Sequence, residues 1–244
     1  QINEGELFAL LIAEKALQNY RGTVFEKRLS AAFQKIAESL PDAVSIHLNE
    51  WDEALSFRHT GESEVEVEIF DRVSQATAKR RQLKIRYRKP NQKPEERVID
   101  PYQLANINNE WYLYAFDHKR RDIRCFVPTR ILEVESTGKS FERPDSFTLD
   151  NYLADSFGVY KGDESYDIHV RFTKMVAPFI KEKNWHPTQQ IKNLKDGSVE
   201  LSLQLSHLSD VQRWILGWGS QATVLAPKEL AEAVHAEAQG IVDN

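Results

Sequence analysis

The spacing of apolar residues along the chain changes its period near residue 80. Between residues 6 and 40, leucines and aromatic residues recur every three or four positions, which is typical of amphipathic helices. A capping box formed by Ser63 and Glu66 begins one more segment with the same spacing. The pattern therefore predicts that residues 1–79 are mostly helical.

Beyond this region the pattern alternates between apolar and polar residues, as expected for strands with one buried face. The stretch LKIRYRK is the clearest case, because Leu83, Ile85 and Tyr87 alternate with basic residues. Further strands are predicted at three ranges: 97–107, 110–116 and 123–135. The first of them can be one strand or two strands bent near Pro101. Several short strands joined by turns within about 60 residues favour a small β-barrel.

The second half of the chain predicts a different domain. Residues 147–160 are expected to form a connecting helix, and the stretch GVYKGDES at 158–165 has the composition of a linker. After it, the periodicity predicts the order β, α, β, β, α, β, and Pro227 stands where a final helix is expected to begin. This order is typical of a ferredoxin-like domain, so the predicted fold class is α+β.

The distribution of charge changes this picture more than the composition does. The whole chain has 32 basic and 37 acidic residues and a net charge of −5. Residues 79–130 hold 14 Lys and Arg against 6 Asp and Glu, a local charge of +8, so the remainder carries −13. Two interpretations stay open: a solvated charged face, or an electropositive site for phosphate-bearing ligands or nucleic acid.

Several kinds of chemistry find no support in the sequence. The seven histidines are scattered without a chelating spacing, no Ser/His/Asp set can be defended, and Glu95 and Glu96 in a proline-flanked turn are expected to be solvated. Cys125 is the single cysteine, and no apolar run is long enough to cross a bilayer. We therefore expect a cytoplasmic protein with no catalytic residues, no metal, no cofactor and no membrane contact.

A row of basic and aromatic residues is the strongest candidate for a binding site. If residues 123–131 form one strand, a single face carries Arg124, Phe126, Pro128 and Arg130. Guanidinium groups match phosphate oxygens and an aromatic ring offers a stacking surface, which suits a nucleotide or a short single strand. The alternative is that these arginines form salt bridges with acidic neighbours, namely Asp117, Asp122 or Glu133.

Four segments occur in an order that resembles the WYL-domain transcriptional regulators of bacteria. They are IRYRK, VIDPYQL, the name-giving Trp111-Tyr112-Leu113, and RCFVPTRI. Residues 5–29 resemble the helical linker that follows the winged helix-turn-helix in these proteins, and residues 170–230 resemble their C-terminal extension domain. The resemblance covers nearly the whole chain.

The resemblance implies a division of the chain into four parts. Residues 1–79 would be a helical linker and dimerisation region, and residues 80–142 an Sm-like or SH3-like five-stranded barrel that senses a ligand. Residues 143–164 would be a connecting helix and linker, and residues 165–244 a ferredoxin-like extension domain. The protein would be a homodimer.

The family resemblance also implies the residues of the ligand site. Nucleotides and single-stranded nucleic acid are the leading class of effector in this family. The residues that match are Arg124, Arg130 and Phe126, then Tyr87 and Tyr112, and finally Arg120 and Arg121 in the preceding loop. The chain departs from the family at Val127, where a further arginine is frequent, and at Pro128, which lacks a backbone donor.

We therefore expect the ligand-sensing and dimerising part of a bacterial transcriptional regulator. Operator DNA would be bound only through a winged helix-turn-helix, which is not visible in these residues. An alternative is a stand-alone nucleotide- or nucleic-acid-binding accessory module of a phage-defence or DNA-repair system. An enzyme acting on nucleotides is a third, less favoured interpretation, because no catalytic set supports it.

Overall fold

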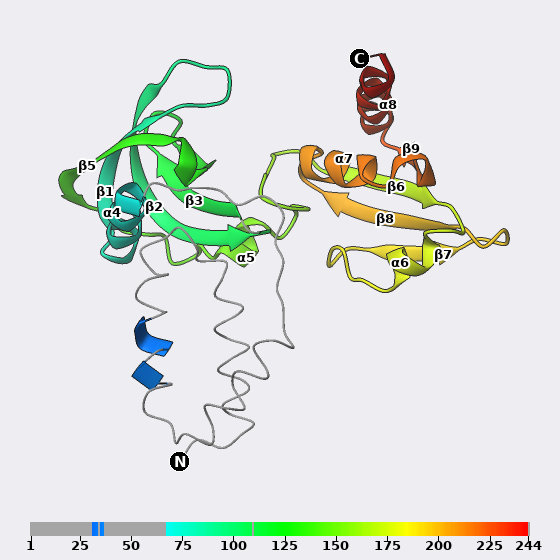
Figure 1. Ribbon diagram of the computed structural model, residues 1–244, viewed down its shortest axis with the longest axis horizontal. Coiled ribbons are helices and arrows are strands. Elements are labelled where there is room, and N and C mark those ends of the chain that lie inside the picture. Colours follow the sequence, from blue (N-terminus) through cyan, green and yellow to red (C-terminus); the bar gives the residue numbers. More distant parts are fainter. Residues whose placement is uncertain (1–30, 34, 37–66, 109, 244) are drawn as a thin grey trace. The chain divides into compact units, whose positions relative to one another are not determined.

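The computed structural model describes residues 31–33, 35–36, 67–108 and 110–243 (Figure 1). The chain divides into two compact units between Arg143 and Pro144, and each unit is described by itself. The helices predicted between residues 6 and 40 and the capping box at Ser63 lie largely or entirely outside the described residues.

One helix packs on the sheet of the first unit. Helix α4 (Val67–Ala78) contacts strands β1, β2 and β5. Its residues Ile69, Val73 and Ala76 are buried in the core, as their helical spacing predicts. The neighbouring Phe70 is fully buried against the ring of Trp111.

The first unit contains a five-stranded antiparallel sheet of order β4-β3-β2-β1-β5. Its strands are β1 (Arg81–Tyr87), β2 (Glu95–Ile107), β3 (Glu110–Asp117), β4 (Asp122–Phe126) and β5 (Ile131–Ser140). The register places Leu83 opposite Ile99, and Ile99 opposite Asp117. Strand β2 is continuous, but its pairing with β3 shifts between Pro101 and Gln103, where the proline offers no backbone donor.

The single strand predicted at 123–135 is wrong, because a 3-10 helix (Pro128–Arg130) separates β4 from β5. Pro128 has no N–H for a ladder, and the N–H of Val127 donates to the Tyr87 hydroxyl at 3.1 Å instead. In the described part of the chain no ladder joins β4 to β5, so the sheet is not closed by hydrogen bonds. The predicted Sm-like barrel is therefore not confirmed; the unit is a helix on an antiparallel sheet.

The second unit contains a four-stranded antiparallel sheet of order β7-β8-β6-β9. Its elements are β6 (Tyr166–Phe172), α6 (Ala177–Lys181), β7 (Gln190–Asn193), β8 (Val199–Leu205), α7 (Ser209–Leu216), a 3-10 helix (Gly219–Gln221), β9 (Ala222–Ala226) and α8 (Lys228–Asp243). The predicted order of strands and helices is present. Pro178 lies in the first turn of α6, where its missing N–H costs no helical hydrogen bond.

The core of the second unit lies on one face of this sheet. Side chains at alternate positions of β6 and β8 pack against α6, α7 and α8. Three tryptophans, Trp185, Trp214 and Trp218, extend this core with ring centroids 4.8–6.2 Å apart. The whole chain is thus a mixed α/β protein with two antiparallel sheets.

The connecting helix predicted at 147–160 is also corrected. Only α5 (Leu149–Tyr152) forms, a single turn capped by the Thr148 side chain, which accepts a hydrogen bond from the N–H of Asn151. After this turn, a backbone carbonyl bonds to a distant part of the unit instead. The oxygen of Asp155 accepts the N–H of Ser206 at 2.7 Å. This contact replaces a hydrogen bond that would have continued the helix.

Candidate functional site

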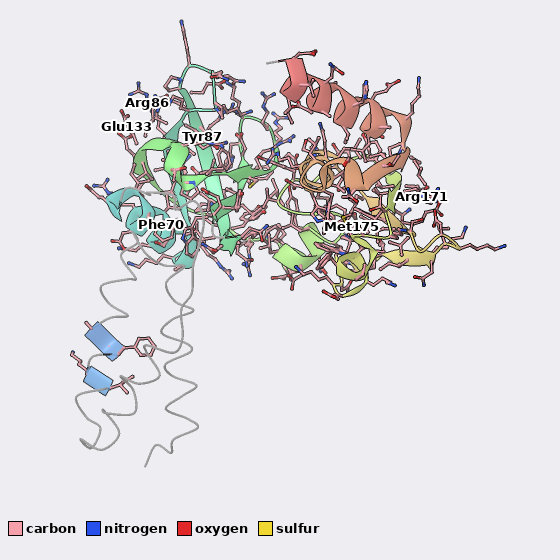
Figure 2. All side chains as sticks on the ribbon, turned by 45° about the vertical axis from the view of Figure 1, so that its right-hand side comes forward. Phe70, Arg86, Tyr87, Glu133, Arg171 and Met175 are labelled. Carbon is pink, nitrogen blue, oxygen red and sulfur yellow. The ribbon has the colours of Figure 1, made fainter. Side chains whose placement is uncertain are left out.

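Much of the positive charge in the basic segment is neutralised by its neighbours in the sheet. Lys84 lies 2.8 Å from Glu96, and Arg86 lies 2.6 Å from Glu133 (Figure 2). Glu133 belongs to β5, which pairs with β1 although it is distant in sequence. Glu96 is already counted in the local charge of +8, whereas Glu133 lies outside residues 79–130 and neutralises one further positive charge of this sheet.

Five basic residues gather in two turns at the same end of the sheet and form no ion pair with other described residues. They are Arg88, Lys89 and Lys93 between β1 and β2, and Arg120 and Arg121 between β3 and β4. All five are exposed. This end of the sheet presents positive charge to solvent, as phosphate groups require.

A buried ion pair supports one of these turns. Arg97 donates to Asp117 at 3.1 Å, and the two side chains are only 5% and 3% exposed. The other carboxylate oxygen of Asp117 accepts the backbone N–H groups of Lys119 at 2.9 Å and Arg120 at 3.4 Å. Arg121 completes the turn with a positive φ of 54°. The carboxylate thus determines where these basic residues lie.

Glu95 connects the buried pair to the surface. Its carboxylate accepts from Lys119 at 2.8 Å and from Arg97 at 2.8 Å. The hydrogen bond from Lys119 and then the charge of Arg97 lower the pKa of Glu95. Glu95 is 42% exposed, as its predicted solvation requires, but its two ion pairs and the buried Arg97 were missed. Asp117 was named only as a possible partner of Arg124 or Arg130. The signal for Arg97 was its alternation with Ile99, which places both on the buried face.

Tyr87, Phe126 and Arg130 lie close together in the structure. The two aromatic residues pack next to the 3-10 helix that carries Arg130. The rings of Tyr87 and Phe126 lie 5.1 Å apart in an edge contact, and they are 7% and 4% exposed. Burial raises the pKa of Tyr87, against the opposing effects of the Val127 N–H and Arg130. Phe126 is therefore a core residue and offers no open ring face for stacking.

The predicted row of Arg124, Phe126 and Arg130 is interrupted. Arg124 and Phe126 share a face of β4, opposite Ala115 and Leu113, but the 3-10 helix that carries Arg130 turns by about 120° per residue. Strand alternation therefore ends at residue 126. Arg124 is exposed and lies 3.0 Å from Asp122, so the predicted salt bridge with an acidic neighbour also exists.

The remaining predicted residues lie elsewhere. Tyr112 pairs with Ala105 and faces the side of β3 opposite to Leu113, away from Arg124. Arg120 and Arg121 precede β4, and about 14 Å of strand separates its first residue from Phe126. The structure thus separates the predicted set. Arg120 and Arg121 lie in a turn, and Arg124 is exposed and paired with Asp122. Tyr87 and Phe126 form a buried pair with Arg130 beside it, and Tyr112 lies on the other face.

Features of other site classes were sought among the described residues. Within them, no three His, Cys, Asp or Glu side chains are grouped so that they could hold a metal ion. None of their helices combines the length and the apolar character needed to cross a bilayer.

Two domain families match the chain. Residues 68–136 match the WYL domain, and residues 164–242 match the WCX domain. Protein PafC of Mycobacterium tuberculosis is 24% identical over 244 residues, which is all of this chain and 72% of PafC. The uncharacterized HTH-type transcriptional regulator YobV of Bacillus subtilis is 26% identical over 148 residues, 59% of this chain and 46% of YobV.

Two solved structures are also similar. Proteasome accessory factor B/C (PafBC) of Arthrobacter aurescens is 21% identical, with a TM-score of 0.36, over 80% of this chain and 31% of that one. A CRISPR Cas-related protein is 11% identical, with a TM-score of 0.48, over 72% of this chain and 50% of that one. The chain thus spans half or less of either structure. With a WYL domain followed by a WCX domain, it is a regulator-like protein of the WYL-domain family.

Proposed function

We propose that this chain is the effector-sensing and dimerising part of a DNA-binding transcriptional regulator. The observation that carries the proposal is the succession of a WYL and a WCX domain in a chain related to PafC and to an HTH-type regulator. Operator DNA would be bound by a winged helix-turn-helix outside these residues. The chain itself would catalyse no reaction.

The proposal includes a more specific fold for each unit. Two contacts favour an Sm-like curvature of the first sheet: the N–H of Val127 bonds to the Tyr87 hydroxyl, and the N–H of Arg88 bonds to the Arg130 carbonyl at 3.0 Å. Both bring the turn after β4 to the end of β1. In the second unit, the order of elements and the antiparallel pairing favour a ferredoxin-like domain.

The proposed effector is a nucleotide or a short single-stranded nucleic acid. Its phosphates would bind arginines of the first unit, with the exposed Arg124 and the half-buried Arg130 as primary contacts and the exposed Arg120 and Arg121 as secondary ones. This assignment uses the predicted arginines but changes the role of the aromatic residues. Tyr87 and Phe126 would position the turn that carries Arg130, and Tyr112 would not contact the ligand.

Fluorescence anisotropy with a labelled single-stranded decanucleotide tests this proposal. The affinity should fall as salt increases, because each phosphate contact contributes about −0.7 to the slope of log K against log salt. Replacing Arg124 or Arg130 by Ala should weaken binding and make this slope shallower. Arg86→Ala is the matched control, since Arg86, like Arg124, is an exposed arginine of the same sheet that is paired with an acidic residue, but it is not among the proposed contacts.

Two results would count against this assignment. One is an absence of binding at low salt to the decanucleotide and to cyclic mononucleotides. The other is an equal loss of affinity in the Arg86 control, which would indicate attraction by net charge alone. The proposed homodimer is tested separately by sedimentation velocity, where a monomer at micromolar concentration would contradict it.

A further inference from the structure

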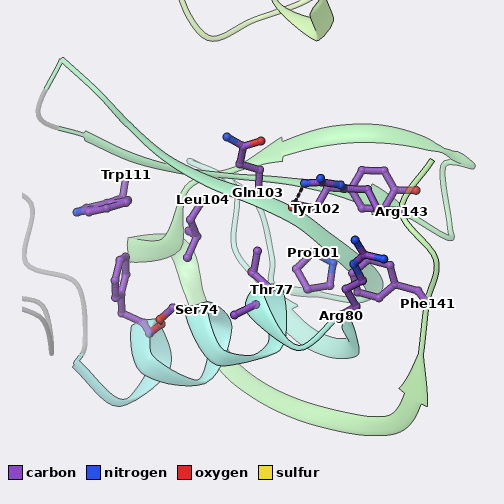
Figure 3. Close-up of a pocket in the computed structure, with 12 residues that line it drawn as sticks. Ser74, Thr77, Arg80, Pro101, Tyr102, Gln103, Leu104, Trp111, Phe141 and Arg143 are labelled. Atoms are coloured by element: carbon purple, nitrogen blue, oxygen red, sulfur yellow. Dashed lines mark hydrogen bonds between the residues drawn. The ribbon is translucent and has the colours of Figure 1, made fainter. Parts of the chain in front are cut away.

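A cavity of about 450 Å³ lies in the first unit between α4, the bent part of β2 and the residues that follow β5 (Figure 3). Its lining includes none of the arginines proposed above to bind the effector. The volume is within the range of about 300–1,000 Å³ that is usual for small-molecule sites. The cavity is therefore a separate candidate site.

Four segments form its walls, one of which is β3 through Trp111. Helix α4 contributes Phe70, Ser74 and Thr77, which recur at helical spacing on the side next to its core-facing residues. The irregularity in β2 between Pro101 and Gln103 bends the opposite wall. The rim is closed where the N–H of Phe141 donates to the Arg80 carbonyl at 3.1 Å.

The two ends of the cavity differ in chemistry. Figure 3 shows Trp111 and Leu104 at one end, and Tyr102, Phe141, Arg80 and Arg143 at the other. At the first end, the Trp111 ring meets Phe70 edge-on at 4.9 Å. At the second, the rings of Tyr102 and Phe141 lie 5.8 Å apart, next to the two guanidinium groups.

The charged side chains that line the cavity are positive. Among the described lining residues there are two arginines and no Asp or Glu. The hydroxyls of Ser74 and Thr77 donate to carbonyls of their own helix, at Phe70 and Val73, so the arginines are the strong donors of the site. An anion fits this lining better than a cation does.

The backbone at Arg80 gives an independent argument. Arg80 follows the end of α4 with a positive φ of 52°, a conformation that favours Gly or Asn at this position. Backbone preference therefore does not explain an arginine here. Arg80 also forms no ion pair with the other described residues. Its side chain lines the cavity, which supplies a reason for the residue type.

We propose that this cavity binds a small aromatic anion. A flat ring system would lie between the aromatic side chains, and its carboxylate would accept hydrogen bonds from Arg80. The first unit would then carry a second ligand site that is independent of the Arg124 and Arg130 effector site.

Isothermal titration calorimetry of the whole chain with 2-naphthoate tests this proposal. Arg80→Asn removes the guanidinium group and suits the positive φ, so the variant should fold and should bind 2-naphthoate about tenfold more weakly. Ser74→Leu should fill the cavity and abolish binding. Lys79→Ala is the matched control, because this neighbouring cation lines a different cavity and should leave the affinity unchanged.

The neutral 2-naphthamide should bind the original chain about as weakly as 2-naphthoate binds the Arg80→Asn variant. Arg124→Ala should leave 2-naphthoate binding intact, which separates this proposal from the effector proposal. No binding of 2-naphthoate at millimolar concentration would overturn the inference. Equal affinity for the acid and the amide, or an equal loss in Lys79→Ala, would overturn it as well.

Discussion

The two sheets of this protein differ in whether charged side chains are buried on them. The first encloses the ion pair of Arg97 and Asp117 on its buried face, where their cross-strand neighbours are Ile85 and Ile99. The core cluster of the second consists of apolar side chains, extended by three tryptophans. Within the described residues of the second unit, the buried polar side chains are three serines and His186.

This difference indicates which interactions stabilise each unit. In the first, a buried carboxylate fixes a turn of basic residues, so its electrostatics and its surface charge depend on each other. In the second, apolar packing stabilises the sheet, and polar groups serve to attach a loop to it. Four changes test this contrast, and each is expected to have a smaller effect than the one before it.

The largest effect is expected from Arg97→Met. The change leaves the Asp117 carboxylate buried without its cation, which typically costs about 3–5 kcal/mol. Hydrogen exchange of the amides in β2 and β3, read by mass spectrometry, would measure the loss of local stability. The double variant Arg97→Met with Asp117→Leu should recover part of it, because the buried carboxylate is gone, while the N–H groups of Lys119 and Arg120 lose their acceptor. A loss below about 1 kcal/mol in the single variant would contradict the electrostatic role.

Removing one tryptophan should test the apolar side of the comparison. Trp214 contacts Phe157, Phe172, Trp185 and Trp218, so Trp214→Ala should lower the free energy of unfolding of the second unit by about 3 kcal/mol. Urea denaturation followed by hydrogen exchange would show this. Phe179→Ala is the control, since its side chain is 54% exposed and should change stability by less than about 0.5 kcal/mol.

A smaller effect is expected at Asp210. One oxygen of its carboxylate accepts the N–H groups of Val159 at 2.9 Å and Tyr160 at 3.2 Å. Asp210→Ala should lower stability by about 1–3 kcal/mol, and Asp210→Asn by less because an acceptor remains. Limited proteolysis at residues 158–162 would report the loosened segment. If the Ala variant were as resistant as the original chain, the segment would be held by other contacts.

The smallest effect is expected from pH at His186. Burial lowers its pKa below the ordinary 6.5, although the Ala154 carbonyl and Asp155 oppose the shift. As pH falls through 6.5, the unfolded chain takes up a proton that the folded chain does not. Stability should therefore decrease from neutral pH down to the lowered pKa and level off below it. Urea midpoints between pH 7.5 and 5 should show a weaker pH dependence in His186→Gln.

The sequence predicted the parts of the fold that depend on local spacing. Strands β1 and β3 follow from alternation, and the order of elements in the second unit follows from turns and periods. The break at Pro128–Arg130 was missed because alternation continues through it in the sequence. Two features break the strand. Pro128 has no N–H for a ladder, and the N–H of Val127 donates to the distant Tyr87 hydroxyl instead.

The candidate site was less predictable because it also depends on contacts between residues that are distant in the sequence. Counting charge in a window could not include Glu133, which neutralises Arg86 only because β5 pairs with β1. The aromatic cavity combines residues from four separate segments, so no short motif describes it. Arg124 and Arg130 were found from the alternation of basic and aromatic residues and then from the family resemblance, and their role in binding stays a prediction.

The loop before the second sheet determines where this protein can be divided. The match to the WCX domain begins at residue 164, but Ala154, Asp155 and Gly162 are already bonded to that unit through His186 and Ser206. A Cβ at Gly162 would lie 2.2 Å from the Ser206 carbonyl, so the fit allows no side chain there. A fragment cut at residue 164 would leave His186 and Asp210 without their partners. A fragment cut at the unit boundary, beginning with Pro144, would retain them, and it is the one to choose for expressing the second unit alone.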